Sequence, residues 1–242
     1  MIKFYIHVPE LPGWQSLTVE FLEKIEASGL ADSEHRQIIL CLNGNEIAMR
    51  DFLSPLLDNS DSYTAVHVSD DSWRCEWPTL NYLKQQCDSS TDNDYIGYAH
   101  LKGLTKPNSK PVQDWKDYLV YWGIERWETS IAQLKAGYDT SSVNWFDNPW
   151  PHYSGNFWWA TSDYIRRLEP LQDPATIDFG RAVSKYLKPY VILDPGNFRY
   201  EHEAWLGSVS ANRYELHVGP NKTIDIDYHY HSEYPAENYR LK

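Results

Sequence analysis

The fold expected for this chain rests on one continuous apolar run, Ile38-Ile39-Leu40-Cys41-Leu42. Such runs are typical of strands that are buried on both faces of a parallel sheet, whereas half-exposed strands alternate apolar and polar residues. Helical patterns flank the run at residues 14–28 and 46–57, and strand patterns lie outside them at residues 2–8 and 63–68. This order predicts an α/β fold with one Rossmann-like, mostly parallel central sheet flanked by helices, which binds ligands outside the carboxyl ends of its strands.

The rest of the chain continues to alternate between helices and strands. The longest helical pattern, at residues 115–136, carries apolar residues about every 3.6 positions and ends before Gly137. The further elements that we expect are strands at residues 95–99 and 138–145 and helices at residues 76–87, 164–168, 177–187 and 203–207.

The composition argues against several classes of protein. Hydrophobic residues make up 42% of the 242 residues, and no apolar run approaches the ~20 residues of a membrane-spanning helix. The three cysteines have no Cys-x-x-Cys spacing, which argues against a disulfide framework and a thiolate zinc site. We therefore expect a cytoplasmic protein without a membrane span, in the host cytoplasm if the protein is viral. The net charge of −12 disfavours nucleic acid as a partner without excluding it.

A second stretch, Pro151-His152-Tyr153-Ser154-Gly155-Asn156-Phe157-Trp158-Trp159-Ala160, has the character of a binding site. Successive side chains of a strand point to opposite faces, so Trp158 and Trp159 cannot share one core, and we expect one of them to line a pocket. Gly155, between two short polar residues, lets a ligand approach the backbone. This combination suits a sugar. The alternative is a tight turn that leads into a buried aromatic strand.

Charged residues follow two of the expected strands. Asp70 and Asp71 come after the third strand, and His100-Leu101-Lys102-Gly103 comes after the strand at residues 95–99. We expect Lys102 to stabilise the charge that builds on a departing phosphate. Glu76 either belongs to this edge of the sheet or serves as a charge at the start of the next helix.

Patterns of metal ligands occur at two further places. Asp92-Asn93-Asp94 has the Asp-x-Asp form that holds a divalent cation, but it precedes its strand and is expected to be mostly a solvated loop at the other end of the sheet. In the tail, His229 and His231 alternate with tyrosines and would share one face of a strand. Two imidazoles on one face can bind a transition metal.

A candidate general base lies in Glu201-His202-Glu203. An alcohol is a poor nucleophile at neutral pH, so a carboxylate that takes its proton accelerates the attack. We expect this base to be Glu203, because it opens the helix at residues 203–207, where the backbone dipoles favour the ionised carboxylate. Glu201 and Asp71 are the alternatives.

With His100-Leu101-Lys102-Gly103, the run from His152 to Ala160 and Glu203-Ala204-Trp205-Leu206 in this order, the chain resembles small glycosyltransferases of the A-type nucleotide-sugar fold from bacteria and large DNA viruses. The resemblance spans most of the chain. It implies one domain over residues 1–242, with a nucleotide-sugar-binding half at residues 1–110 and an acceptor-binding and catalytic half at residues 111–242. It also implies transfer of a sugar from a nucleotide diphosphate sugar to an acceptor hydroxyl. With Glu203 as the general base, we expect this transfer to proceed with inversion.

Strand order and the resemblance together predict roles for particular residues. The catalytic residues would be Glu203, Lys102 and Glu201. The donor would be bound by His7, Val8, Asp70, Asp71, Glu76, Thr79, His100 and Gly103. The acceptor or the sugar would be bound by His152, Ser154, Gly155, Asn156, Trp158 and Trp159.

The metal is where this chain departs from the family. Members of the wider fold carry Asp-x-Asp at the end of the strand that here ends in His100 to Gly103. Either Asp70 and Asp71 bind Mn²⁺ or Mg²⁺, with His229 and His231 as further candidate ligands, or Lys102 and the tail histidines carry the phosphate charge without a metal.

Other functions compete with sugar transfer. A non-catalytic carbohydrate-binding module would explain the tryptophans, and a hydrolase would use paired carboxylates. For a transferase, the acceptor is open: a glycan, a lipid-linked sugar, a small hydroxyl compound or a hydroxymethylated base of viral DNA.

Overall fold

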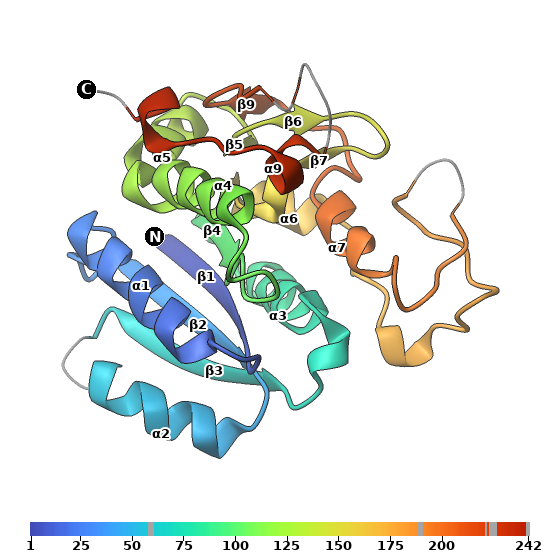
Figure 1. The fold of residues 1–242 in the computed structure, drawn as a ribbon, viewed down its shortest axis with the longest axis horizontal. Coiled ribbons are helices and arrows are strands. Elements are labelled where there is room, and N and C mark those ends of the chain that lie inside the picture. The colour runs from blue at the N-terminus through green and yellow to red at the C-terminus, as the bar shows by residue number, and fades with distance from the viewer. Residues whose placement is uncertain (58–60, 188–190, 221, 223–226, 241–242) are drawn as a thin grey trace.

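The computed structural model describes residues 1–57, 61–187, 191–220, 222 and 227–240. One seven-stranded sheet crosses the molecule in the order β3-β2-β1-β4-β8-β5-β9 (Figure 1). Its first four strands are parallel, and β8 pairs antiparallel with both β4 and β5. The strands are β1 (Ile2–Pro9), β2 (Arg36–Asn43), β3 (Tyr63–Ser69), β4 (Tyr95–His100), β5 (Thr140–Ser142), β8 (Trp158–Thr161) and β9 (Arg213–Glu215). The predicted α/β fold with a mostly parallel central sheet is confirmed.

Helices cover both faces of the sheet, so that each face has its own hydrophobic core. In β1 the alternation separates Phe4, Ile6 and Val8, which enter one core, from Tyr5, which enters the other. The helices are α1 (Trp14–Ala27), α2 (Glu46–Leu57), α3 (Trp77–Asp88), α4 (Lys110–Val120), α5 (Trp127–Lys135), α6 (Ser162–Arg167), α7 (Arg199–Trp205) and α9 (Tyr228–His231). A second sheet consists of β6 (Trp145–Phe146) and β7 (His152–Tyr153). Within the described ranges, no helix has the length and apolar character to cross a membrane.

The long helix expected at residues 115–136 is two helices joined by a π-helical turn at Tyr121–Glu125. In that turn the Gly123 carbonyl oxygen accepts a hydrogen bond from the Trp159 indole at 2.9 Å. A side chain of the sheet thus satisfies a backbone group where the helical register changes. The apolar pattern is continuous across this turn, so periodicity did not reveal the break.

Two other elements differ from the prediction. The helix expected at residues 177–187 is irregular chain, because the Ser184 hydroxyl accepts hydrogen bonds from the backbone N–H groups of Tyr186 and Leu187. A side chain that takes these donors competes with helical pairing. The strand expected at residues 138–145 is shorter, since Asn144 has φ 51 and turns the chain between β5 and β6.

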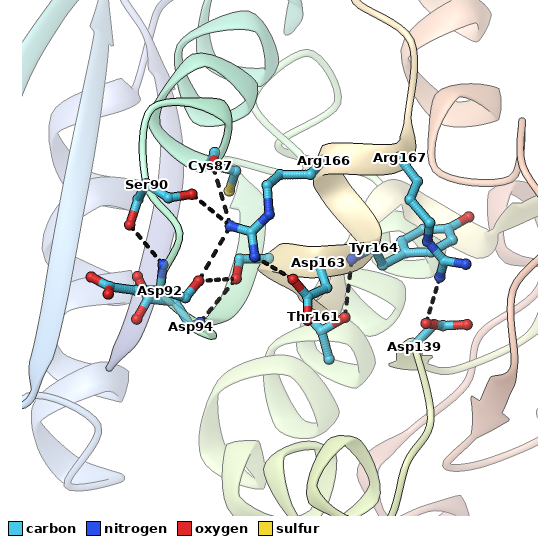
Figure 2. Close-up of polar contacts among 11 residues, drawn as sticks. Cys87, Ser90, Asp92, Asp94, Asp139, Thr161, Asp163, Tyr164, Arg166 and Arg167 are labelled. Carbon is cyan, nitrogen blue, oxygen red and sulfur yellow. Dashed lines mark hydrogen bonds and ion pairs between the residues drawn. The ribbon is translucent and has the colours of Figure 1, made fainter.

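The amino edge of β4 is held by ion pairs of Asp94 and by hydrogen bonds from Arg166, and Figure 2 shows the contacts of Arg166. Asp94 is buried and pairs with Lys3 at 2.6 Å and with the chain's amino group at 2.9 Å, so the expectation of a solvated loop is wrong for this residue. Arg166 donates to the carbonyl oxygens of Cys87, Ser90 and Asp92. The Asp-x-Asp segment therefore anchors the loop before β4, at the edge of the sheet away from Lys102.

Candidate functional site

Two adjoining cavities open at the carboxyl edge of the parallel strands. The larger cavity, of 470 Å³, lies among α4, α7, α9 and the chain around Trp150 and His152. The smaller cavity, of 280 Å³, lies over the ends of β1 and β4. Helix α9 packs on α4 and α7 packs on β7, which brings these walls together (Figure 1). Four residues line both cavities: Lys106, Arg199, Glu203 and Tyr230.

The smaller cavity is lined by four of the eight residues expected to bind the donor, together with Lys102. His7, Glu76, His100, Lys102 and Gly103 all line it. They come from β1, from the start of α3 and from the end of β4, and the parallel register of β1 and β4 brings His7 opposite His100. The carboxyl edge predicted from the strand order is therefore where these side chains meet.

Four expected donor residues lie outside the smaller cavity. Val8 is fully buried in the core. Thr79 lies behind the cavity wall, where its hydroxyl is 2.8 Å from Nδ1 of His7. Asp70 faces His67, with 3.3 Å between the carboxylate and Nε2, and Asp71 accepts a hydrogen bond from the backbone N–H of Trp73. Val8, whose side chain points into the core, is the plain error among these predictions.

The imidazoles of the smaller cavity are neutral at pH 7. Burial lowers the pKa of His7 to about 4 and that of His100 to about 3. Nε2 of His100 lies 3.0 Å from the Gly155 carbonyl oxygen, which can only accept, so this nitrogen carries the proton. His100 thus ties the end of β4 to the aromatic run rather than supplying a positive charge.

Lys102 supplies a cation at the base of the smaller cavity. Its ammonium nitrogen lies 3.6 Å from the centroid of the Trp115 ring. Removal from water lowers the pKa of Lys102 to about 8, against the opposing effect of Glu203 and Glu76. The side chain is therefore mostly protonated at pH 7 and is poised to gain from a bound anion.

Glu76 is held in a buried hydrogen-bond network. Its Oε2 accepts from the Tyr98 hydroxyl at 2.6 Å and from the Asn156 amide at 2.7 Å. The side-chain oxygen of Asn156, Oδ1, in turn accepts a hydrogen bond from the Trp158 indole N–H at 3.0 Å. Glu76 occupies the N-cap position of α3, as expected for a charge at the start of that helix, but its side chain makes no cap bond there and belongs to this network instead.

The Ser154-Gly155-Asn156 turn brings Asn156 to this network. Gly155 has φ +76, and a Cβ there would lie 2.4 Å from Cδ1 of Leu119, so only glycine fits between the turn and α4. Asn156 has φ +53, a conformation that asparagine tolerates better than most residues. Ser154 and Gly155 line the larger cavity, whereas the buried Asn156 lies behind it.

The two adjacent tryptophans do not line either cavity. Trp158 is 2% exposed and stacks on Tyr98, and Trp159 is 1% exposed and packs on Phe4. Strand β8 lies inside the sheet with a core on each face, which is why both rings are covered. The expectation that one of them lines a pocket is wrong, and the alternative of a tight turn leading into a buried aromatic strand describes this part of the run.

Other aromatic residues take the place of these tryptophans in the larger cavity. Its rings are Trp115, Trp150, Tyr200 and Tyr230. The Trp150 and Tyr200 rings lie 5.0 Å apart, and His152 stands beside them with Nδ1 2.8 Å from the Trp150 carbonyl oxygen. Sequence reasoning missed these four rings as a group, because they come from four separate segments. The one local sign of this aromatic wall was Trp150, which stands next to a proline in a loop.

The helix α7 separates the two candidate carboxylates. Glu203 lines both cavities, and burial raises its pKa against the opposing effects of Lys102, His152 and Arg199. Glu201 points to the other side, where it accepts a hydrogen bond from the buried Ser184 hydroxyl, and it lines neither cavity. Residues two apart on a helix face different directions.

The reason first given for choosing Glu203 is wrong. The helix begins at Arg199, so Glu203 stands near its carboxyl end, where the dipole does not favour a negative charge. A partly buried carboxyl with a raised pKa remains suited to take up a proton near neutral pH.

The candidate metal ligands do not converge. Within the described ranges, no three or more His, Cys, Asp or Glu side chains are grouped to hold a metal. The segment with His229 and His231 is the short helix α9 and not a strand. His229 is buried against Trp115 and Tyr118, whereas His231 lines the larger cavity. The expected common face of the two histidines is therefore wrong.

Comparison with known proteins places the chain in a family. Residues 14–213 match the family described as domain of unknown function DUF8361. The chain belongs to this family. No curated protein matches it.

Two solved structures resemble the chain at low identity. One is a provisionally assigned nucleotide-diphospho-sugar transferase from Desulfovibrio desulfuricans, with 12% identity, a TM-score of 0.42, and coverage of 90% of this chain and 79% of the other. The other is a 4-diphosphocytidyl-2C-methyl-D-erythritol synthase from Anaerococcus prevotii, with 9% identity, a TM-score of 0.41, and coverage of 93% and 89%.

Proposed function

We propose that this protein is a transferase that moves a sugar from a nucleotide diphosphate sugar to a hydroxyl group of an acceptor. The observation that carries the proposal is the position of Glu203 at the junction of two cavities. A donor in the smaller cavity and an acceptor in the larger one would meet beside this carboxylate. Lys102, at the base of the smaller cavity, would lie on the donor's side of the junction.

The proposed reaction is a single displacement. Glu203 takes the proton of the acceptor hydroxyl while the oxygen attacks the anomeric carbon of the donor sugar. The bond from that carbon to the phosphate oxygen breaks, and its electron pair leaves with the nucleoside diphosphate. The sugar is transferred with inversion, and Lys102 stabilises the negative charge that grows on the leaving group.

The aromatic walls of the larger cavity support a sugar or sugar-like acceptor. Trp115, Trp150 and Tyr200 offer flat apolar faces, and His152 and Glu203 offer polar atoms at the same wall. Ligand sites commonly combine apolar walls with a few polar groups that orient the ligand. In this proposal the four rings of the larger cavity take the sugar-binding role first expected of Trp158 and Trp159.

The test begins with the donor. The Tm of the protein is measured with UDP-, GDP-, TDP- and ADP-sugars. A ligand at ~100 times its Kd adds ~2.7 kcal/mol to the free energy of unfolding, so a bound donor raises Tm. The donor that stabilises the protein is then incubated with hydroxyl acceptors, and nucleoside diphosphate and glycosylated product are quantified. If none of these nucleotide sugars stabilised the protein, the proposal would be refuted, and a non-catalytic carbohydrate-binding module would be the remaining function.

The role of Glu203 is tested by Glu203→Gln, which keeps size but cannot accept the proton. We expect donor affinity to persist and kcat to fall by about 10²- to 10⁴-fold. The control is Glu128→Gln, an exposed carboxylate on α5, which should leave kcat unchanged. Transfer at the normal rate by Glu203→Gln would remove Glu203 from this role.

A hydrolase is the second candidate, because Glu76 and Glu203 both line the smaller cavity. In that case water would replace the acceptor, and free sugar would appear at the same rate with and without hydroxyl compounds. Dependence of nucleoside diphosphate release on an acceptor would distinguish the transferase from the hydrolase.

A further inference from the structure

The smaller cavity is poor in ligands for a divalent cation. Mg²⁺ and related cations prefer sites where several oxygen atoms converge. Among the described residues, the carboxylates that line this cavity are Glu76 and Glu203. Oε2 of Glu76 already accepts hydrogen bonds from Tyr98 and Asn156, which leaves little capacity to coordinate a metal. The donor set does not fit a resident Mn²⁺ or Mg²⁺.

Three cations stand where the metal would be needed. Lys102, Lys106 and Arg199 all line the smaller cavity, and the last two also line the larger one. The ion pairs within 4 Å among the described residues involve none of these three side chains. No carboxylate in the part of the chain that the structure describes therefore neutralises one of these charges by direct contact.

Each of the three cations lies over an aromatic ring of the larger cavity. Lys102 lies 3.6 Å from the Trp115 centroid, Lys106 lies 4.6 Å from the Tyr230 centroid, and the Arg199 guanidinium lies 4.8 Å from the Tyr200 centroid. A ring face attracts a cation without consuming its hydrogen-bond donors or its charge. Arg199 donates one N–H to the Tyr200 hydroxyl at 2.9 Å, and its other donors, like the charges of all three cations, stay available to an anion.

We infer, on the basis of the proposed function, that the diphosphate of the donor is bound by Lys102, Lys106 and Arg199 without a divalent cation. The two lysines act as point charges, and the planar Arg199 fork can donate two parallel hydrogen bonds to phosphate oxygens. Lys106 and Arg199 line both cavities at their junction, where the bond between sugar and phosphate would break, and Lys102 lines the smaller cavity beside them. They replace the metal in countering the charge of the leaving group.

The charges around Lys102 fit this role. Its pKa is lowered to about 8 by removal from water and by the neighbouring Arg199 and Lys106, whereas Glu203 and Glu76 act in the opposite direction. A bound diphosphate would raise this pKa and secure the proton. Three positive charges that lie this close together are the pattern expected of an anion-binding site.

The experiment measures binding of inorganic pyrophosphate by isothermal titration calorimetry, which does not depend on the identity of the nucleotide or the acceptor. Titrations are run in EDTA and again with Mn²⁺ present. We expect binding in EDTA with a Kd within about threefold of the value in Mn²⁺. Lys102→Ala, Lys106→Ala and Arg199→Ala should each weaken binding in EDTA by about 10- to 100-fold, as expected for the loss of a hydrogen bond to a charged group.

The control is Lys135→Ala, an exposed lysine at the end of α5 that should bind pyrophosphate as the native protein does. Lys106 lies on an exposed loop, so its variant keeps the test valid if Lys102→Ala fails to fold. Binding of pyrophosphate and of a nucleotide sugar only with Mn²⁺ would overturn the inference and leave the proposed transferase intact. Binding of pyrophosphate in EDTA without any affinity for nucleotide sugars would support the anion site and contradict the proposed function.

Discussion

The substitution Asn156→Ala tests whether the network behind the site is structural as well as functional. It removes the donor that holds Oε2 of Glu76 and the acceptor of the Trp158 indole. Trp158 is 2% exposed, so its N–H would be left in the interior without a partner. Alanine would also have to adopt the φ of +53 that asparagine has here. Three separate costs therefore fall on one position.

The expected magnitude follows from these contacts. A hydrogen bond to a charged acceptor contributes about 1.5–3 kcal/mol, and an orphaned interior donor costs about 1–3 kcal/mol. A non-glycine residue without a polar side chain in the left-handed region costs about 1–2 kcal/mol. Because the surroundings relax and the terms overlap, we expect a loss of about 3–5 kcal/mol in the free energy of unfolding. For a chain of this size that corresponds to a fall in Tm of about 10 °C.

The assay is urea unfolding followed by tryptophan fluorescence, with Asn156→Asp as the matched variant. Aspartate keeps the acceptor for Trp158 and tolerates the backbone conformation, but it sets a second carboxylate against Glu76. Like charge raises a carboxyl pKa in the folded state, so the penalty is full at pH 7 and is lost as the pH falls through that raised pKa. Asn156→Asp should therefore approach native stability near pH 5, whereas Asn156→Ala should not.

The reasoning would be refuted by a loss below about 1 kcal/mol for Asn156→Ala. It would equally fail if the Asp and Ala variants were indistinguishable at both pH values, because the two carboxylates would then not interact.

Two further predictions concern backbone fit and pH. Gly207→Ala should lower Tm by several degrees in thermal unfolding, because its Cβ would lie 2.2 Å from the Pro151 carbonyl oxygen. The matched variant Gly123→Ala should change Tm by less, because its Cβ would meet only Phe157, at 3.4 Å. Equal Tm values for the two variants would contradict this. The affinity for a nucleotide sugar, measured by calorimetry, should fall by up to roughly tenfold per pH unit above about pH 8, because Lys102 loses its proton there. Lys102→Arg keeps its charge over this pH range, so the affinity of this variant should depend less on pH. A native pH profile in Lys102→Arg would assign the titration to another group.

The sheet could be predicted from short-range pattern, and the reason is physical. A strand buried on both faces must be apolar at every position, as at residues 38–42, and a helix against a sheet must repeat its apolar residues every 3.6 positions. These requirements are local, so they can be recognised without knowing the partner. The parallel order then implied that His7, His100 and Lys102 would meet at one edge, and they do.

Local pattern failed where a distant group competes with the neighbouring backbone. The Ser184 hydroxyl, itself bonded to Glu201, takes the amide donors that a helix at residues 177–187 would need. The Trp159 indole reaches the Gly123 carbonyl oxygen from the sheet and accompanies a π-helical turn. Ser184 contacts Tyr186 and Leu187 within three residues, but the Glu201 carboxylate that accepts from its hydroxyl lies 17 residues away. The Trp159 indole lies 36 residues from Gly123. A local pattern cannot show either of these distant partners.

The sequence by itself determined the α/β fold, the parallel edge and the short list of polar residues that end its strands. Only the tertiary structure decided which face of α7 meets the cavities, and hence that Glu203 rather than Glu201 is the candidate base. It also decided that Trp158 and Trp159 are core while Trp115, Trp150 and Tyr200 form the aromatic walls. A side chain's type fixes what it can do, but whether water or a ligand can reach it depends on the segments that pack over it.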